Sequence, residues 1–291
     1  MALALSGACL AAQVYTYIEA KNGKEIGLDK LAAQLQKYDI VFFGEWHDNV
    51  ALHQAEADLA AALFTKDPRL LLSFEMFERD VQNWLDAYQK GDIGEEEFLA
   101  NSRPWGNYAT DYRPLVEFAR QKGLSCVAAN VPRRLAGKAA RAGAGFEEEL
   151  PPEDRVLMAL KVNAPNGQYH DNFLATMQAN AMHGDAQDTE LYDRLYFAQC
   201  LKDDTMAESV LQYRERYPKR LILHFNGDFH SAGFLGTVER VRWRNRKVKI
   251  AVISPLETNS PWPENAHKTA TYFIRVPVAP EAETGATGGQ P

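Results

Sequence analysis

The stretch DIVFFGEWHDN, residues 39–49, is an unbroken apolar run that stops at Gly44 and is followed at once by Glu45 and His47. Such a run is typical of a buried strand that ends in polar side chains. A second copy lies far downstream, where LILHF (221–225) is followed by NGDFH (226–230). Each copy has the form Gly-x-x-His directly after a strand. These two strand ends decide the fold, and they are the main indication of a functional site.

The same order of apolar strand, polar end and helix recurs along the chain. This order predicts an α/β fold with a mainly parallel sheet flanked by helices, of the doubly wound kind. A hairpin over 14–27 around Asn22-Gly23 precedes it. We predict strands at 39–44, 70–74, 124–129, 220–225, 247–253 and 271–276, and helices at 29–37, 51–65, 112–122, 188–216 and 234–244.

The order breaks between residues 133 and 187, where turns rich in Gly and Ala and a Pro-Pro pair precede helical patterns near 153–161 and 170–183. We interpret 133–187 as a helical insertion in an α/β core formed by 13–132 and 188–278. The tail 279–291 has too little apolar content to pack, and we predict that it is disordered.

Composition excludes several classes of function. With 291 residues, 46% hydrophobic and 24% charged, the chain has the composition of a soluble globular protein. A net charge of −7 gives no broad basic surface, so we expect no nucleic-acid partner. Cys126 and Cys200 lie in predicted elements as small buried hydrophobes, so neither a disulfide framework nor a thiolate metal site is indicated.

Cys9 has a different context. The stretch Leu5-Ser6-Gly7-Ala8-Cys9 resembles the end of a bacterial lipoprotein signal, in which small residues precede the cysteine that becomes lipidated. The leucine stands one position early, and no basic segment precedes it. We interpret 1–12 as the remnant of such a signal, so that any membrane attachment is through lipid at Cys9.

Polar side chains follow several of the predicted strands. Because the carboxyl ends of parallel strands meet at one edge, these side chains should line one cleft. Imidazole and carboxylate groups together suit metal ligation or general acid and base chemistry. A single glycine and histidine after a strand more often serve a turn and a hydrogen bond, whereas two copies with a further Glu favour a site. The residues concerned are Glu45, His47, Glu75, Asn130, Asn226, Asp228 and His230.

Other histidines, His53, His183 and His267, lack this context, and we interpret them as structural. The chain contains no P-loop, dinucleotide-binding or Gly-x-Ser-x-Gly segment, which disfavours those three chemistries.

The insertion contains a second candidate site, in GQYHDNF (167–173). Tyr169 is ordinarily explained as an interfacial aromatic with a satisfied hydroxyl. A tyrosine phenolate is also a hard anionic ligand suited to ferric haem. Neighbouring helical side chains diverge by about 100°, so Tyr169 and His170 would serve one iron across a dimer rather than from one chain.

Five segments in this order resemble the ChaN-like haem-binding lipoproteins, within the wider group of Tiki, TraB and erythromycin-esterase-type proteins. They are FFGEWHDNVALH, SFEMFERDVQ, VEFARQKGLSCVAANVPRR, KDDTMAES and HFNGDFHSAGF. The resemblance implies an α/β domain with a smaller helical domain, and haem bound through tyrosine at a homodimer interface. It also implies iron uptake at the bacterial outer membrane, where an outer-membrane haem receptor would be a partner.

Two functions are therefore expected. The first is a non-catalytic haem-binding lipoprotein with Tyr169 and His170 at the haem. The alternative is a metal-dependent hydrolase of the esterase or protease type. In that case Glu45 and Glu75 would act as acid and base, while His47 and His230 would bind a divalent metal or carry protons.

Overall fold

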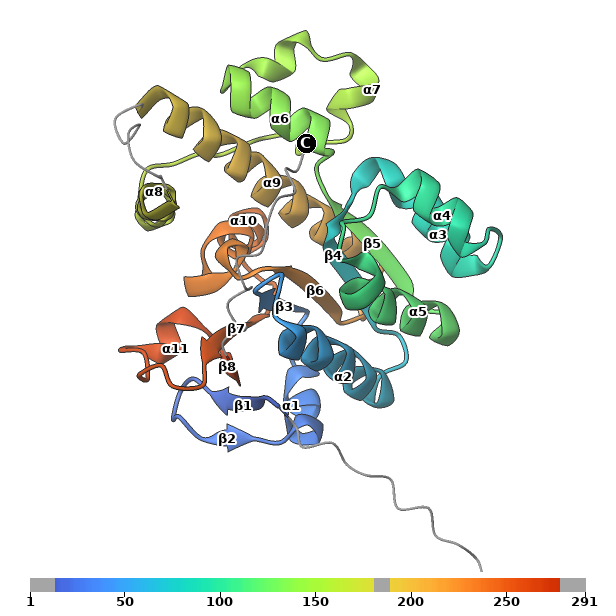
Figure 1. Ribbon diagram of the computed structural model, residues 1–291, viewed down its shortest axis with the longest axis vertical. Coiled ribbons are helices and arrows are strands. Elements are labelled where there is room, and N and C mark those ends of the chain that lie inside the picture. Colours follow the sequence, from blue (N-terminus) through green and yellow to red (C-terminus); the bar gives the residue numbers. More distant parts are fainter. Residues whose placement is uncertain (1–13, 181–188, 278–291) are drawn as a thin grey trace, which may run out of the picture.

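The computed structural model describes residues 14–180 and 189–277 and contains one eight-stranded sheet, in the order β2-β1-β8-β7-β3-β6-β4-β5. Figure 1 shows this sheet between helices on both of its faces. The strands are β1 (Thr16–Glu19), β2 (Glu25–Ile26), β3 (Ile40–Glu45), β4 (Leu71–Glu78), β5 (Ser125–Asn130), β6 (Ile222–Gly227), β7 (Ile250–Glu257) and β8 (Tyr272–Val276).

Six of these strands, from β8 to β5, run parallel, and only the hairpin β1–β2 pairs antiparallel at one edge. The predicted α/β fold with a mainly parallel sheet is confirmed. The two Gly-x-x-His segments follow β3 and β6, which are adjacent, with Gly44 opposite Asn226 and Glu45 opposite Gly227. Adjacent parallel strands deliver their carboxyl ends to the same place, so this pairing positions the site.

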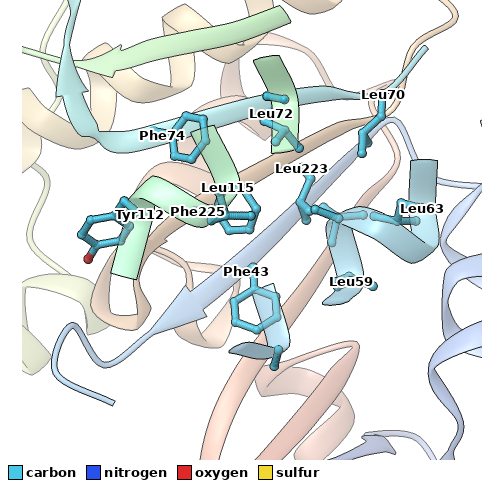
Figure 2. Close-up of a cluster of buried hydrophobic side chains, with 14 of the residues drawn as sticks. Phe43, Leu59, Leu63, Leu70, Leu72, Phe74, Tyr112, Leu115, Leu223 and Phe225 are labelled. Atoms are coloured by element: carbon cyan, nitrogen blue, oxygen red, sulfur yellow. The ribbon is translucent and has the colours of Figure 1, made fainter. Parts of the chain in front are cut away.

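The larger core lies on one face of the sheet, under α1 (Leu28–Leu35), α2 (Val50–Lys66), α3 (Gln82–Lys90) and α5 (Arg113–Lys122). Side chains alternate across a strand, so Val41 and Phe43 of β3 face this core. Figure 2 shows Phe43, Phe74 and Phe225 from three neighbouring strands packed with leucines of α2 and α5. Burial of these apolar side chains excludes water from beneath the strand ends.

A second core lies on the opposite face, where α9 (Thr189–Arg216) and α10 (Gly236–Arg244) cover Ile40 and Phe42 of the same strand. Strands buried on both faces are apolar throughout, which explains the unbroken run that begins at residue 40.

Residues 133–180 contain no strand. They form α6 (Arg133–Ala142), η3 (Phe146–Glu149), α7 (Pro152–Arg155) and α8 (Gln168–Asn180). In Figure 1, α6 and α7 lie beyond the sheet at the top of the view, while α8 lies beside α9. Leu135 and Ala139 of α6 pack against Leu201 of α9. The division of the chain into a core and an inserted domain stays a prediction.

One predicted helix is much shorter than expected. The pattern at 153–161 predicts a helix, but α7 ends at Arg155. The following backbone N–H groups bond to side chains of α9: Ala159 donates to Thr205 Oγ1 at 3.1 Å and Asn163 to Asp204 Oδ2 at 2.7 Å. These bonds satisfy the backbone without a helix, so tertiary contacts outweigh local preference here.

Several sequence predictions lie outside the described residues. They are the lipidated Cys9 with segment 1–12, His183, and the tail 279–291. Cys126 and Cys200 are buried and free, as predicted. Within 14–180 and 189–277, no helix combines the length and the hydropathy needed to cross a membrane.

Candidate functional site

The two Gly-x-x-His segments interlock at the ends of β3 and β6. A Cβ atom added to Gly44 would lie 2.2 Å from Asp228 Oδ1, and one added to Gly227 would lie 2.8 Å from His47 Nε2. Each glycine therefore leaves the space that a side chain of the other segment fills. Turn geometry alone would not demand both glycines, so close approach explains them better.

The first polar group of the site is centred on Glu45, which is buried. Its Oε1 atom lies 2.6 Å from His47 Nδ1 and accepts a hydrogen bond of 2.6 Å from the Tyr112 hydroxyl. Burial opposes the charged form, but the hydrogen bonds with His47 and Glu56 lower the pKa of Glu45 below its usual value. Glu45 is thus a carboxylate at neutral pH that fixes the imidazole of His47.

His47 is the accessible member of the site, with 45% of its side chain exposed. Burial disfavours its cation, yet hydrogen bonding to Glu45 and the charge of Glu75 raise its pKa. The ring also packs edge-on against Trp105, with centroids 4.9 Å apart. With Nδ1 held by a carboxylate, Nε2 is the nitrogen left for a ligand or a proton.

The second polar group is a buried ion cluster around His230. Its Nε2 lies 3.2 Å from Glu75 Oε1 and its Nδ1 lies 2.7 Å from Asp203 Oδ1. Burial opposes the cation, but Glu75 and Asp203 raise the pKa of His230 to about 10. The same contacts outweigh burial at both carboxyls and hold their pKa values below the usual range. At neutral pH the cluster is an imidazolium between two carboxylates.

The two groups meet at Gly227, whose N–H donates to Glu75 Oε2 at 2.8 Å and whose Cα faces His47. The structure therefore brings together the four predicted residues Glu45, His47, Glu75 and His230. Both glutamates are ionised, so each accepts a proton but neither holds one to donate. Metal ligation by His230 would require one of its two carboxylates to leave.

Three other polar residues predicted at this edge have local partners. Asn130 Oδ1 accepts from the N–H of Val131 at 2.9 Å, and Asn226 donates to Ser231 Oγ at 3.0 Å. Asp228 turns back toward Gly44, and burial raises its pKa to about 7. These three side chains do not join the two polar groups.

Comparison with known proteins identifies the family. The family model described as "Haem-binding uptake, Tiki superfamily, ChaN" matches residues 31–241. The chain belongs to this family. No curated protein matches this chain.

Two solved structures are similar to this ChaN-family chain. One is described as cofacial heme binding to ChaN of Campylobacter jejuni, with 17% identity, 89% of this chain and 96% of that chain covered, and a TM-score of 0.69. The other is a mutant of the erythromycin esterase EreC in its open conformation, with 13% identity, coverage of 92% and 99%, and a TM-score of 0.54. At these identities the likeness shows a shared fold.

In this ChaN-family protein, Tyr169 and His170 lie in the first turn of α8. Tyr169 is 4% exposed, and its ring packs in an aromatic cluster with Phe173, Tyr196 and Phe229. His170 is partly buried and packs edge-on against Tyr196, with centroids 4.7 Å apart. The two neighbouring side chains thus have different surroundings, as expected for adjacent helical positions. Their role at haem stays a prediction.

Asp203, which was not predicted as a site residue from the sequence, links Tyr169 to the strand-end cluster. The Tyr169 hydroxyl donates to Asp203 Oδ2 at 2.5 Å, while Oδ1 of the same carboxylate contacts His230. Burial and the neighbouring carboxylate raise the pKa of Tyr169 well above its usual value. A signal was present, because Gln199 and Asp203 lie one turn apart on one face of a predicted helix. Gln199 also contacts both Tyr169 and His230.

His53 and Glu56 of α2 are also more closely tied to the site than expected. The sequence places them one turn apart on a helix and gave no reason to connect them with β3. The structure buries both beside Glu45 and brings their donor atoms together with those of Glu45.

Proposed function

We propose that this protein binds ferric haem through Tyr169, with His170 of a second copy assisting across a homodimer interface, and that it serves haem-iron uptake. The observation that carries the proposal is the match of the haem-binding ChaN family over residues 31–241. The first turn of α8 also has the donors that ferric iron prefers.

Burial and Asp203 keep Tyr169 protonated in the haem-free protein, so a phenolate would form only with iron bound. Its hydroxyl proton already points at the Asp203 carboxylate, 2.5 Å away, which is a ready acceptor when iron replaces the proton. The Arg240 guanidinium lies 5.2 Å from the ring centroid and favours a negative charge there. Because Tyr169 is 4% exposed, haem ligation requires α8 to separate from the aromatic cluster. We therefore expect haem binding to disrupt the packing of Tyr169 on Phe229.

Haemin titration of the full chain tests this proposal. The wild type should give a Soret band and the absorption of a high-spin ferric phenolate, and Tyr169→Phe should lose the phenolate features. Tyr196→Phe is the matched control, because its hydroxyl belongs to the same cluster but donates to the carbonyl oxygen of Pro165. An unchanged spectrum in Tyr169→Phe would remove it as the ligand, and no Soret band in the wild type would remove the function.

Dimerisation and membrane attachment are separate parts of the proposal. Sedimentation with and without haemin measures whether haem shifts the protein to a dimer, and His170→Ala should weaken that shift. Lipid at Cys9 would anchor the protein at the outer membrane, where it would receive haem from a receptor. Incorporation of labelled palmitate in the wild type but not in Cys9→Ala is the expected result, and equal labelling would exclude Cys9.

We propose a hydrolase as the second candidate function, because the Glu45–His47 pair has the arrangement of a general base. A buried carboxylate 2.6 Å from Nδ1 orients the ring, and the half-exposed side chain leaves Nε2 available to take a proton from water. A divalent metal would supply a Lewis acid in the metal-dependent form of this function. Loss of ester or peptide hydrolysis in His47→Asn but not in the surface variant His267→Asn would support it, and an inert wild type would oppose it.

A further inference from the structure

The buried imidazole of His53, on α2, lies between the carboxyl groups of Glu45 and Glu56. His53 is 6% exposed, and Glu45 and Glu56 are 1% and 0% exposed. His53 Nδ1 lies 3.1 Å from Glu56 Oε2 and 3.9 Å from Glu45 Oε2. None of these contacts belongs to the cluster around His230, so this group is a separate chemical environment.

Hydrogen positions follow from the partners of His53. Its Nε2 lies 3.1 Å from the backbone carbonyl oxygen of His47, which can only accept a hydrogen bond, so Nε2 carries the hydrogen. In the neutral ring, Nδ1 then presents a lone pair toward two carboxyl groups that also present lone pairs. This arrangement needs a positive species between them, which is either a proton or a metal ion.

Two oxygen atoms of the group accept no hydrogen bond from an N–H group or hydroxyl of the described residues. They are the buried Glu45 Oε2 and Glu56 Oε1, and the two carboxyls lie close enough to share a proton. The other oxygen of Glu45, Oε1, contacts His47 and Tyr112. Buried carboxylate oxygens without such donors are costly, and a bound cation or a shared proton removes that cost.

The charged groups around His53 also favour a bound cation. Asp111 adds a third carboxylate, with Oδ2 3.6 Å from His53 Nε2. Across residues 14–180 and 189–277, no Lys or Arg forms an ion pair with Glu45, Glu56 or Asp111. Burial and the charge of Glu45 raise the pKa of Glu56 well above its usual value, so Glu56 holds a proton unless a cation takes its place.

We propose that Glu45, His53 and Glu56 bind one divalent transition-metal cation such as Zn²⁺, Mn²⁺ or Co²⁺. One donor atom from each residue lies within 4.8 Å of the other two. Donors bound to one cation at about 2.1 Å lie at most about 4.2 Å apart, so side-chain shifts of less than about 1 Å close the site. Mixed imidazole and carboxylate ligation suits these metals. The bond from His53 Nε2 to a carbonyl oxygen is the outer contact that metal-bound histidines usually make.

This location differs from the strand-end cleft predicted from the sequence. Glu45 is shared: Oε2 faces the cation while Oε1 holds His47. The cation would therefore stabilise the negative charge of the residue that orients His47. The site does not depend on haem, and it can be tested on haem-free protein.

The experiment measures metal content in the full chain after stripping with chelator, incubation with Zn²⁺, Mn²⁺ or Co²⁺ and desalting. We expect one equivalent in the wild type, a raised thermal midpoint on metal addition, and visible absorption bands with Co²⁺. Glu56→Gln and His53→Asn should weaken binding by at least about tenfold. Glu75→Gln, which changes a carboxyl outside the three proposed ligands, is the matched control and should retain the metal.

Three outcomes would overturn the proposal. One is a folded wild type that binds no metal and shows no change in thermal midpoint, in which case a proton on Glu56 occupies the position. The second is metal retained by both Glu56→Gln and His53→Asn. The third is metal lost in Glu75→Gln, which would place it in the strand-end cleft. Because the wild-type measurements stand alone, misfolding of a variant does not leave the question open.

Discussion

Replacing His230 with Asn should destabilise the protein strongly and in a pH-dependent way. His230 is buried between Glu75 and Asp203, and its pKa is raised from 6.5 to about 10. At about 1.36 kcal/mol per pKa unit, this shift corresponds to about 5 kcal/mol of stabilisation. Removing one partner from a buried ion cluster typically costs about 3–5 kcal/mol. We therefore expect a loss of that size in the free energy of unfolding near neutral pH.

The sign of the pH dependence separates this explanation from simple loss of packing. Because the folded-state pKa is raised, the contribution of His230 is complete below 6.5 and is lost as the pH rises through about 10. In the Asn variant, Glu75 and Asp203 are left as unpaired buried carboxylates. As the pH rises from about 6 to about 10 the wild type loses the contribution of His230, so the cost of the substitution should shrink over this range.

Urea unfolding of wild type and variant at both ends of this pH range measures this difference. His224→Asn is the matched control, because His224 is equally buried but neutral. Burial lowers the pKa of His224 to about 3. Its side chain is hydrogen-bonded to Ser73. Its substitution should cost roughly 1–3 kcal/mol at both pH values. A cost for His230→Asn below about 1 kcal/mol, or one that does not change with pH, would refute the ion cluster.

Three further predictions concern the same strand ends. Gly44→Ala should lower the free energy of unfolding by at least about 1–3 kcal/mol, since the new Cβ would lie 2.2 Å from Asp228 Oδ1 and 3.0 Å from its Cα. The control Gly106→Ala, with open space around it, should change the free energy of unfolding by under about 0.5 kcal/mol. Equal effects of the two substitutions would contradict close packing at Gly44. Above pH 7, Asp228→Asn should be more stable than wild type by up to about 4 kcal/mol. The reason is that Asp228 holds a proton up to about pH 7 in the folded wild type, whereas the unfolded chain releases it near 3.8. Urea unfolding between these pH values and above them would show no gain in the variant if the folded carboxyl were ionised. Glu75→Gln should lose less stability than the wild type as the pH falls below 4.5. The lowered pKa of Glu75 stabilises the wild type above pH 4.5, and this stabilisation is lost in acid. Thermal midpoints that fall with pH as steeply in the variant as in the wild type would count against it.

The sequence predicted the parts of the molecule that depend on local pattern. The apolar run before Gly44 and its second copy predicted two buried strands of a mainly parallel sheet, because residues buried on both faces leave no polar alternation. The carboxyl ends of these strands then fixed where Glu45, His47 and His230 would meet.

Partners contributed by helices could not be predicted in the same way. Asp203 comes from α9 and His53 from α2, and which face of a helix meets a strand end is decided by packing in three dimensions. The short α7 has the same cause, since its continuation bonds to Thr205 and Asp204.

The interlocking of the two Gly-x-x-His segments has a consequence for folding kinetics. The bond from Gly227 to Glu75 joins residues 152 positions apart, and β3 pairs with β6 over a similar stretch of chain. Contacts of such long sequence separation form slowly, because much chain entropy is lost before the contacts stabilise the chain. The polar cluster can therefore assemble only after the central strands have docked. A fluorescent probe beside this cluster would report the last stage of folding, whereas helical circular dichroism would report earlier ones.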